Sequence, residues 1–288
     1  MLNSKEQQGN SLPSRESRGG SNIYFISDLH LGAGTLNNPL DYERRVVRFL
    51  ESIEDDCDEL FLVGDIIDYW FEYRYVAPQG FTRFLGQLGK MSDKGTKIHW
   101  FTGNHDIWIF DYIPQEIGCE VHREPMMIEL NGKQMFIAHG DGLGDDSKAL
   151  KLMTGFFHNR FCQWAFSWIH PDITTKFAHW WSKKSRLDGD DFPEFLGENK
   201  EHLVLYAKNK LQEVKEQGKH IDYFIFGHRH IELDLMMSRD TRLFILGDWI
   251  KHFSYAVMDE NGRMWMDNFE TPLGYEEEEQ REGVSIAF

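Results

Sequence analysis

Short apolar segments rich in β-branched and aromatic residues recur along the chain from residue 22 onward, each bounded by Gly, Asp or Asn. Segments of this length and composition predict buried β-strands. Apolar residues spaced three and four apart over residues 42–53 predict a helix with one buried face. A second amphipathic helix is predicted at about residues 198–217, ending before Gly218. The predicted strands cover residues 23–26, 60–63, 98–101, 135–138, 223–226 and 243–246.

The succession of strands and helices predicts an α/β protein with its elements arranged in layers. Asn131-Gly132 and Asn261-Gly262 each lie between alternating segments, which is the signal of a two-residue hairpin. Some strands should therefore be antiparallel, and we expect a sandwich of mixed sheets with helices outside. Residues 1–21 are expected to be a disordered lead-in and residues 271–288 an acidic tail. Between them, residues 22–270 should form one domain with a helical cap insertion at about residues 150–217.

The composition supports a folded, water-soluble domain. Hydrophobic residues make up 41% of the chain and aromatic residues 14%, which is ample material for a core and excludes a disordered protein. The sequence has neither a segment apolar enough to span a membrane nor an N-terminal secretory signal, so we expect a cytoplasmic protein. Three scattered cysteines argue against a disulfide framework and against a zinc site built on cysteine.

The net charge of −16 argues against general nucleic-acid binding, because an acidic surface repels phosphates. Residues 150–186 are an exception, with nine aromatic, six basic and only one acidic residue. His170-Pro171 should divide this segment into two helices, since a residue before proline avoids helical backbone. The segment is either a cap that buries ordinary core, or a surface that takes acyl chains and rests on an anionic bilayer.

Five polar motifs directly follow five of the predicted strands. Loops at the carboxyl ends of strands are where layered α/β proteins place their sites. Residues two apart in extended backbone project to the same side, so Asp-x-His and His-x-His can each grip one centre. The motifs are Asp28-Leu29-His30, Gly64-Asp65-Ile66-Ile67-Asp68, Gly103-Asn104-His105-Asp106, His139-Gly140-Asp141 and Gly227-His228-Arg229-His230.

The side chains of these motifs form a mixed oxygen and nitrogen donor set, which is too large for one tetrahedral zinc ion. The set suits two octahedral ions that share a carboxylate, and Asp65 is the natural bridging residue. Donors of this kind, without thiolate, favour Mn²⁺, Fe or Zn²⁺ over Ca²⁺ or Cu(I). Two divalent ions would also let a phosphate approach an acidic protein. The candidate ligands are Asp28, His30, Asp65, Asn104, His139, His228 and His230.

In their order and spacing, the five motifs resemble those of the calcineurin-like metallophosphoesterase superfamily, over about residues 23–266. The resemblance implies a four-layer α/β/β/α sandwich around a dinuclear metal site. It also implies that His105 is the catalytic histidine and that Asp68 orients it. Carried over motif by motif, it assigns one metal to Asp28, His30, Asp65 and His230, and the other to Asp65, Asn104, His139 and His228.

Within that superfamily, Ser/Thr phosphatases carry Arg-Gly after the second motif, where this chain has Tyr69-Trp70, which disfavours protein phosphatase activity. The insertion is instead similar to the cap of UDP-2,3-diacylglucosamine diphosphatases of the Gram-negative lipid A pathway. That resemblance implies hydrolysis of the pyrophosphate, two Mn²⁺ ions, and a cytoplasmic enzyme held loosely on the inner membrane, with no protein partner. It implies substrate contacts from Asn104, His105, Ser185, Arg186 and His228.

One motif departs from the best-known branch of that family, which has Gly-Asn-Arg-Asp at residues 103–106 and lacks the acid of Asp68. A phosphate leaving group needs charge stabilisation more than a proton, whereas a His/Asp pair can also protonate a poorer alcohol leaving group. The alternative is therefore another calcineurin-like phosphodiesterase or phosphatase, acting on nucleotides or phospholipids. A metal-free binding scaffold is disfavoured, because every ligand position is filled.

Overall fold

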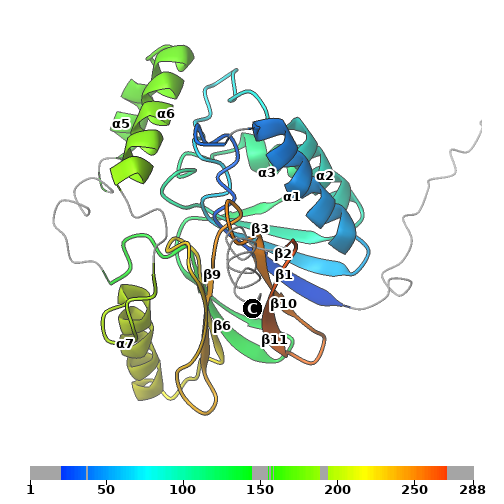
Figure 1. The fold of residues 1–288 in the computed structure, drawn as a ribbon, viewed down its shortest axis with the longest axis vertical. Helices are drawn as coiled ribbons and strands as arrows, with labels where there is room; N and C mark the ends of the chain where they lie inside the picture. The colour runs from blue at the N-terminus through cyan, green and yellow to red at the C-terminus, as the bar shows by residue number, and fades with distance from the viewer. Residues whose placement is uncertain are drawn as a thin grey trace, which may run out of the picture.

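The computed structural model describes residues 21–36, 38–144, 155, 157, 159–188 and 194–270. Two β-sheets face each other, and helices cover their outer faces (Figure 1). This arrangement confirms the predicted α/β sandwich. The predicted acidic tail and almost all of the predicted lead-in lie outside the described residues.

The first sheet has six strands in the order β11-β10-β1-β2-β3-β4. The strands β1 to β4 run parallel, and β10 and β11 extend the sheet as antiparallel strands. The parallel core places the ends of β1, β2 and β3 at one edge, where the first three motifs begin. The bounds are Asn22–Ile26 for β1, Cys57–Val63 for β2, Lys97–Phe101 for β3, Glu120–His122 for β4, Ser254–Met258 for β10 and Met264–Asn268 for β11.

The second sheet has five strands in the order β5-β6-β7-β9-β8, with β6, β7 and β9 parallel to one another. The two outer strands pair in the antiparallel sense. All six predicted strand segments lie within strands of the two sheets, in β1, β2, β3, β6, β7 and β9. The bounds are Met126–Leu130 for β5, Lys133–Ala138 for β6, Tyr223–Phe226 for β7, Glu232–Met236 for β8 and Arg242–Leu246 for β9.

The two Asn-Gly pairs both lie in hairpins, but only the first hairpin has the predicted length. Asn131 and Gly132 join β5 and β6 with φ angles of 46° and 74°, and both must be positive in the tight two-residue turn. Between β10 and β11 only Gly262 has positive φ. There the Asp259 carboxylate accepts from the backbone N–H of Asn261 and Arg263. This side chain holds a wider turn, so the predicted two-residue loop is wrong at that position.

Apolar side chains from both sheets fill the space between them. Phe61 and Phe101 project from the first sheet, and Ile137 and Phe244 from the second. Phe25 of β1 stacks on Phe61 with ring centroids 4.9 Å apart. This buried layer fixes the two sheets against each other, so their motif-bearing edges are held at a constant separation.

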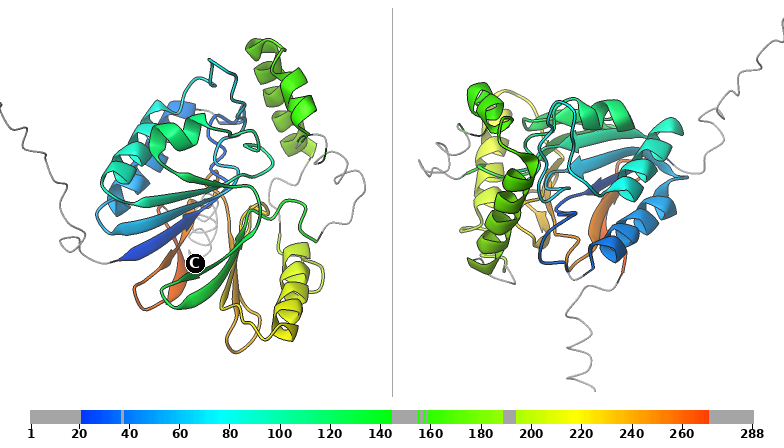
Figure 2. Two further views of the ribbon diagram at one scale, coloured as in Figure 1. Left: turned by 180° about the vertical axis from the view of Figure 1, so that it is seen from behind. Right: turned by 90° about the horizontal axis from the view of Figure 1, so that it is seen from above.

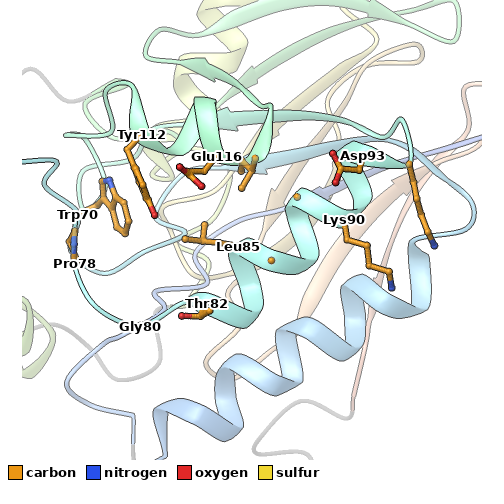
Figure 3. A pocket seen from close by; sticks show the side chains of 13 residues that line it. Trp70, Pro78, Gly80, Thr82, Leu85, Lys90, Asp93, Tyr112 and Glu116 are labelled. Carbon is orange, nitrogen blue, oxygen red and sulfur yellow. The ribbon is translucent and has the colours of Figure 1, made fainter. Parts of the chain in front are cut away.

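The helices α1 (Pro39–Ile53), α2 (Thr82–Asp93) and α3 (Tyr112–Ile117) cover the six-stranded sheet, and α7 (His202–Glu216) covers the five-stranded sheet (Figure 2). The predicted helix over residues 42–53 is thus the main part of α1, which begins one turn earlier because Pro39 suits the first helical position. α7 ends before Gly218, whose φ is 71°. This helix is packed on the sandwich although it lies within the predicted cap insertion.

Two further helices, α5 (Arg160–Phe166) and α6 (Pro171–Asp188), stand at one end of the sandwich, away from both sheets (Figures 1 and 2). The chain breaks between them at His170-Pro171, as predicted. The Phe166 ring contacts the rings of Phe71 and Trp108, at centroid distances of 4.9 and 4.7 Å. The pair is therefore attached to the loops that follow β2 and β3. None of the helices in the described part of the chain could cross a bilayer.

Candidate active site

The motif loops meet where the two sheets face each other, and backbone hydrogen bonds connect them. The amide of Asp28 donates to Gly64 O at 3.0 Å, and the amide of Gly227 donates to His139 O at 2.8 Å. One bond crosses between the sheets, since the His228 amide donates to Asp28 Oδ2 at 2.9 Å. The loops after β1, β2, β6 and β7 therefore form one connected unit.

The backbone at the candidate ligands is left-handed. Asp28, His30, Asp65, His228 and His230 have φ angles between 44° and 68°. Residues with a Cβ rarely adopt this conformation, which costs about 1–3 kcal/mol at each position and persists only where the surroundings impose it. Such strain gathers at functional sites, and here it falls on five of the seven residues that the sequence singled out.

Three glycines allow these side chains to approach the backbone. A Cβ on Gly103 would lie 2.2 Å from Asp65 Oδ1, and one on Gly64 would lie 2.3 Å from His139 Nδ1. A Cβ on Gly227 would lie 2.6 Å from Asp28 Oδ2. No real side chain tolerates such distances, so the site requires glycine at each of these positions.

One group of candidate ligands consists of Asp28, His30 and His230. The Nε2 atoms of His30 and His230 lie 3.2 Å apart, and His230 Nε2 lies 3.3 Å from Asp28 Oδ1. Asp65 Oδ2 lies 3.9 Å from His30 Nε2, at the edge of this group. The four residues that the resemblance assigned to the first metal therefore lie together.

The second group consists of Asp65, His139 and His228. His139 Nε2 lies 3.2 Å from Asp65 Oδ2, the same oxygen that faces His30. Asp65 thus lies between the two groups, where a bridging ligand has to be. Asn104 is exposed in the same loop as His105, whose amide donates to Asp65 Oδ1 at 2.8 Å. Its role as a ligand stays a prediction.

The residues present fit divalent cations. Among the described residues, the buried atoms Asp28 Oδ1 and His139 Nε2 form no hydrogen bond, although His230 Nε2 and Asp65 Oδ2 lie 3.3 and 3.2 Å from them. Leaving such atoms unsatisfied costs about 1–3 kcal/mol each, more for a charged group. Carboxylate oxygens and imidazole nitrogens are ligands that Mn²⁺, Fe and Zn²⁺ accept. A cation in each group would satisfy these atoms.

In this site, burial and neighbouring charges shift the pKa values of the ionisable side chains in opposite directions. Burial raises the pKa of Asp65, but the positive charges of His139 and His105 outweigh it and hold that pKa well below its usual value. Burial lowers the pKa of His139, yet Asp65 raises it well above the ordinary value. Protons and metal ions therefore compete for the same nitrogen, and metal binding should release protons.

Asp248 is a functional residue that the sequence analysis missed. Its Oδ2 lies 3.3 Å from His230 Nδ1, and its Oδ1 accepts from the amides of Ile250 and Lys251. It thereby directs the Nε2 of His230 toward the metal position. The signal was present, because Gly247-Asp248 follows β9 just as Gly64-Asp65 follows β2.

Asp106 and Glu201 hold the loops without facing the metal positions. Asp106 Oδ1 accepts from the Gly103 amide at 2.7 Å, and its Oδ2 accepts from the Ile66 amide and the Trp100 indole. Glu201, fully buried at the start of α7, accepts two hydrogen bonds from the Arg229 guanidinium. These contacts fix the third and fifth motifs in place.

His105 and Asp68 lie next to each other, as the resemblance implied. His105 Nδ1 is 2.9 Å from the Asp68 carbonyl oxygen and 3.4 Å from Asp68 Oδ1. Burial lowers the pKa of His105, but Asp65 and Asp68 raise it to about 9. Because Nδ1 faces Asp68, Nε2 is the nitrogen directed away from that acid. Ser185 and Arg186 belong to α6, and their side chains lie outside the described residues.

Comparison with known proteins identifies one matching family, two similar curated proteins and one similar solved structure. A family model described as calcineurin-like phosphoesterase matches residues 21–232. A UDP-2,3-diacylglucosamine hydrolase of Porphyromonas gingivalis is 39% identical over 254 residues, covering 83% of this chain and 94% of that protein. One of Haemophilus influenzae is 25% identical, with 83% and 95% covered. A solved Vps29 structure from Entamoeba histolytica has a TM-score of 0.41 and 10% identity, covering 85% of this chain and 89% of that one.

The close approach at Gly103 gives a test of the site. Gly103→Ala should lose bound divalent metal and at least about 10²-fold in phosphoesterase activity, because the new Cβ displaces the Asp65 carboxylate. Gly86→Ala on α2 is the matched control, since a Cβ there meets nothing within 4 Å. Mass spectrometry measures the metal content of the two variants, and turnover measures their activity. Wild-type metal content in Gly103→Ala would contradict the assigned geometry.

Proposed function

Since the chain belongs to the calcineurin-like phosphoesterase family, a family of metal-dependent hydrolases, we propose that it hydrolyses the pyrophosphate of UDP-2,3-diacylglucosamine in lipid A biosynthesis. The products would be UMP and 2,3-diacylglucosamine 1-phosphate. The observation that carries the proposal is the 39% identity to the Porphyromonas gingivalis hydrolase, which extends over nearly all of that protein. The convergence of the candidate ligands between the sheets supports it, because it brings together the donor atoms for two metal ions.

The proposed cofactors are two Mn²⁺ ions. One would be held by Asp28, His30 and His230 and the other by His139 and His228, with Asp65 shared by both and Asn104 as a further ligand of the second. When bound, the ions supply Lewis-acid stabilisation of the phosphate charge and an activated water. Asp248 and Asp68 keep the ligand imidazoles oriented, since they face the Nδ1 atoms of His230 and His30.

His105 supplies positive charge to the reacting phosphate. The carboxylates of Asp65 and Asp68 raise the pKa of this imidazole above its ordinary value, which favours the protonated form, and its Nδ1 is directed to Asp68. The Nε2–H can then donate to a phosphate oxygen or to the leaving group. Because the leaving group of a pyrophosphate is itself a phosphate of low pKa, the charge matters more than the transferred proton. We therefore assign His105 to catalysis and Asp68 to its orientation.

The helices α5 and α6 suit a lipid substrate. Aromatic side chains of α5 and its C-terminal turn are largely in solvent, with exposed fractions of 70% for Phe161, 56% for Trp164 and 76% for Trp168. Their rings follow one another at centroid distances of 5.6 and 6.0 Å. On α6, Ile173, Phe177 and Trp180 are also exposed. Exposed aromatics of this density beside basic residues are typical of surfaces that contact lipid.

We infer that this aromatic surface takes the acyl chains and holds the enzyme on the cytoplasmic face of the inner membrane. Ser185 and Arg186, further along α6, are proposed to contact the phosphate or the sugar, together with Asn104, His105 and His228. The basic residues of the segment offset the net charge of −16 where an anionic bilayer has to approach. The protein needs no protein partner for this attachment.

The contact between Asp68 and His105 favours one alternative. An imidazole held by a carboxylate can protonate an alcohol leaving group, which a pyrophosphatase does not require. The second candidate function is therefore a calcineurin-like phosphodiesterase or phosphatase acting on nucleotides or phospholipids.

The substrate assay separates the two candidates. With UDP-2,3-diacylglucosamine in detergent micelles, we expect Mn²⁺-dependent appearance of UMP and of the lipid monophosphate in equal amounts. Asp65→Ala should abolish both, because it removes the carboxylate that lies between the metal positions. If simple phosphodiesters are cleaved and this substrate is not, the family assignment stands and the proposed substrate is wrong.

The role of His105 is tested by two substitutions. His105→Ala should keep its metals and lose about 10²- to 10⁴-fold in kcat. His105→Arg should stay within about tenfold of the wild type on the pyrophosphate, because arginine restores the charge without acting as an acid. An equal loss of kcat in both variants would contradict this assignment. It would indicate that His105 transfers a proton, which a poorer leaving group requires.

The membrane surface is tested by sedimentation with vesicles that contain phosphatidylglycerol. Trp164→Ser/Trp168→Ser should reduce the bound fraction at least about fivefold, because each exposed indole contributes to interfacial binding. Trp265→Ser on β11 is the control, since that exposed indole lies outside the cap. Turnover of a short-chain, micelle-free substrate should change little in the double variant. Unchanged sedimentation would contradict the membrane assignment.

A further inference from the structure

A second cluster of histidine and glutamate side chains lies at an edge of the six-stranded sheet, outside the motif loops. It consists of His99 on β3 and of Glu120 and His122 on β4, the three-residue strand that ends the sheet. His99 stacks on Phe61 at 4.4 Å, so the cluster borders the layer between the sheets. The proposed phosphoesterase reaction uses none of these residues.

The distances in the cluster suit a metal ion. His99 Nδ1 lies 3.2 Å from His122 Nε2, and two nitrogens on one tetrahedral zinc ion are about 3.3 Å apart. Glu120 Oε2 lies 3.8 Å from the first nitrogen and 4.0 Å from the second. The Glu120 side chain is 75% exposed, so it is free to move the remaining distance of roughly half an ångström or slightly more.

Glu59 on β2 orients the cluster. Its Oε2 lies 3.3 Å from His99 Nε2, and its Oε1 accepts from Lys97 Nζ at 3.0 Å. With the Nε2–H of His99 donated to this carboxylate, the lone pair of the imidazole is on Nδ1. The Nδ1 lone pair of His99 then faces His122. A carboxylate that fixes a histidine in this way is the usual outer partner of a metal ligand.

We propose that His99, Glu120 and His122 bind a third divalent metal ion, Zn²⁺, with water in the fourth position. The site is separate from the dinuclear centre and does not depend on the proposed substrate. The ion would join β4 to β3. His122 O also accepts from the Thr102 amide at 3.0 Å, two residues before Asn104. The zinc ion would thereby stabilise the base of the third motif loop.

The test counts metal ions on the full chain. After equilibrium dialysis against buffered Zn²⁺, the wild type should hold three ions per chain and His122→Gln two, with anomalous scattering at the zinc edge locating the difference at His99. His220→Gln is the matched control, because this exposed histidine lies outside both clusters, and it should hold three. His122→Gln should keep at least half of the wild-type phosphoesterase activity.

The variant Glu120→Gln tests the site independently, in case His122→Gln loses the ion only because it folds poorly. Glu120 is exposed, so its replacement leaves packing intact and should weaken the third ion at least about tenfold while the other two stay bound. Equal zinc content in the wild type and His122→Gln would overturn the proposal, and so would an unchanged affinity of the third ion in Glu120→Gln. In either case the contact between His99 and His122 is a hydrogen bond alone.

Discussion

The carboxylate of Asp65, buried between two sheets, is the group on which the site depends. Its oxygens face His30 and His139 and accept the amide of His105, while Gly103 passes so close that no side chain fits. A charged carboxylate without partners would be costly at this depth. The surrounding histidines and the expected cations supply the compensating charge. The loops must therefore adopt a backbone conformation that places these groups next to the Asp65 carboxylate.

The backbone of these loops is strained, and the packing of the two sheets maintains the strained conformation. Positive φ angles at Asp28, Asp65 and His228 would relax in an isolated peptide, since each costs about 1–3 kcal/mol. The aromatic and aliphatic layer between the sheets fixes both strand edges, so the loops between them have little freedom to relax. The cross-sheet hydrogen bond from His228 to Asp28 then closes the unit. Packing of the core thus fixes the positions of the candidate ligand side chains.

Strands and motif positions could be predicted because both are local signals. A buried strand such as residues 60–63 needs only its own apolar run, and the polar residues after it mark the edge of the sheet. Asp248 was missed because its partner His230 lies 18 residues away along the chain, so their contact is visible only in the fold. The predicted length of the β10-β11 loop was wrong for a similar reason, because the Asp259 side chain binds the backbone of the loop and stabilises a wider turn. Such contacts form only when the chain folds.

The pairing of Asp68 with His105 has a structural reason that is independent of the leaving group. Asp68 Oδ1 lies 3.3 Å from His30 Nδ1 and 3.4 Å from His105 Nδ1, so one carboxylate faces both the proposed metal ligand and the proposed catalytic histidine. Its orienting contact with His30 would require the acid whether or not His105 transfers a proton. An Asp/His pair at these positions is therefore compatible with pyrophosphate cleavage, for which a positive charge suffices. The exposed aromatic side chains of α5 and α6 distinguish the two candidate substrate classes, because a small phosphodiester would leave them unused.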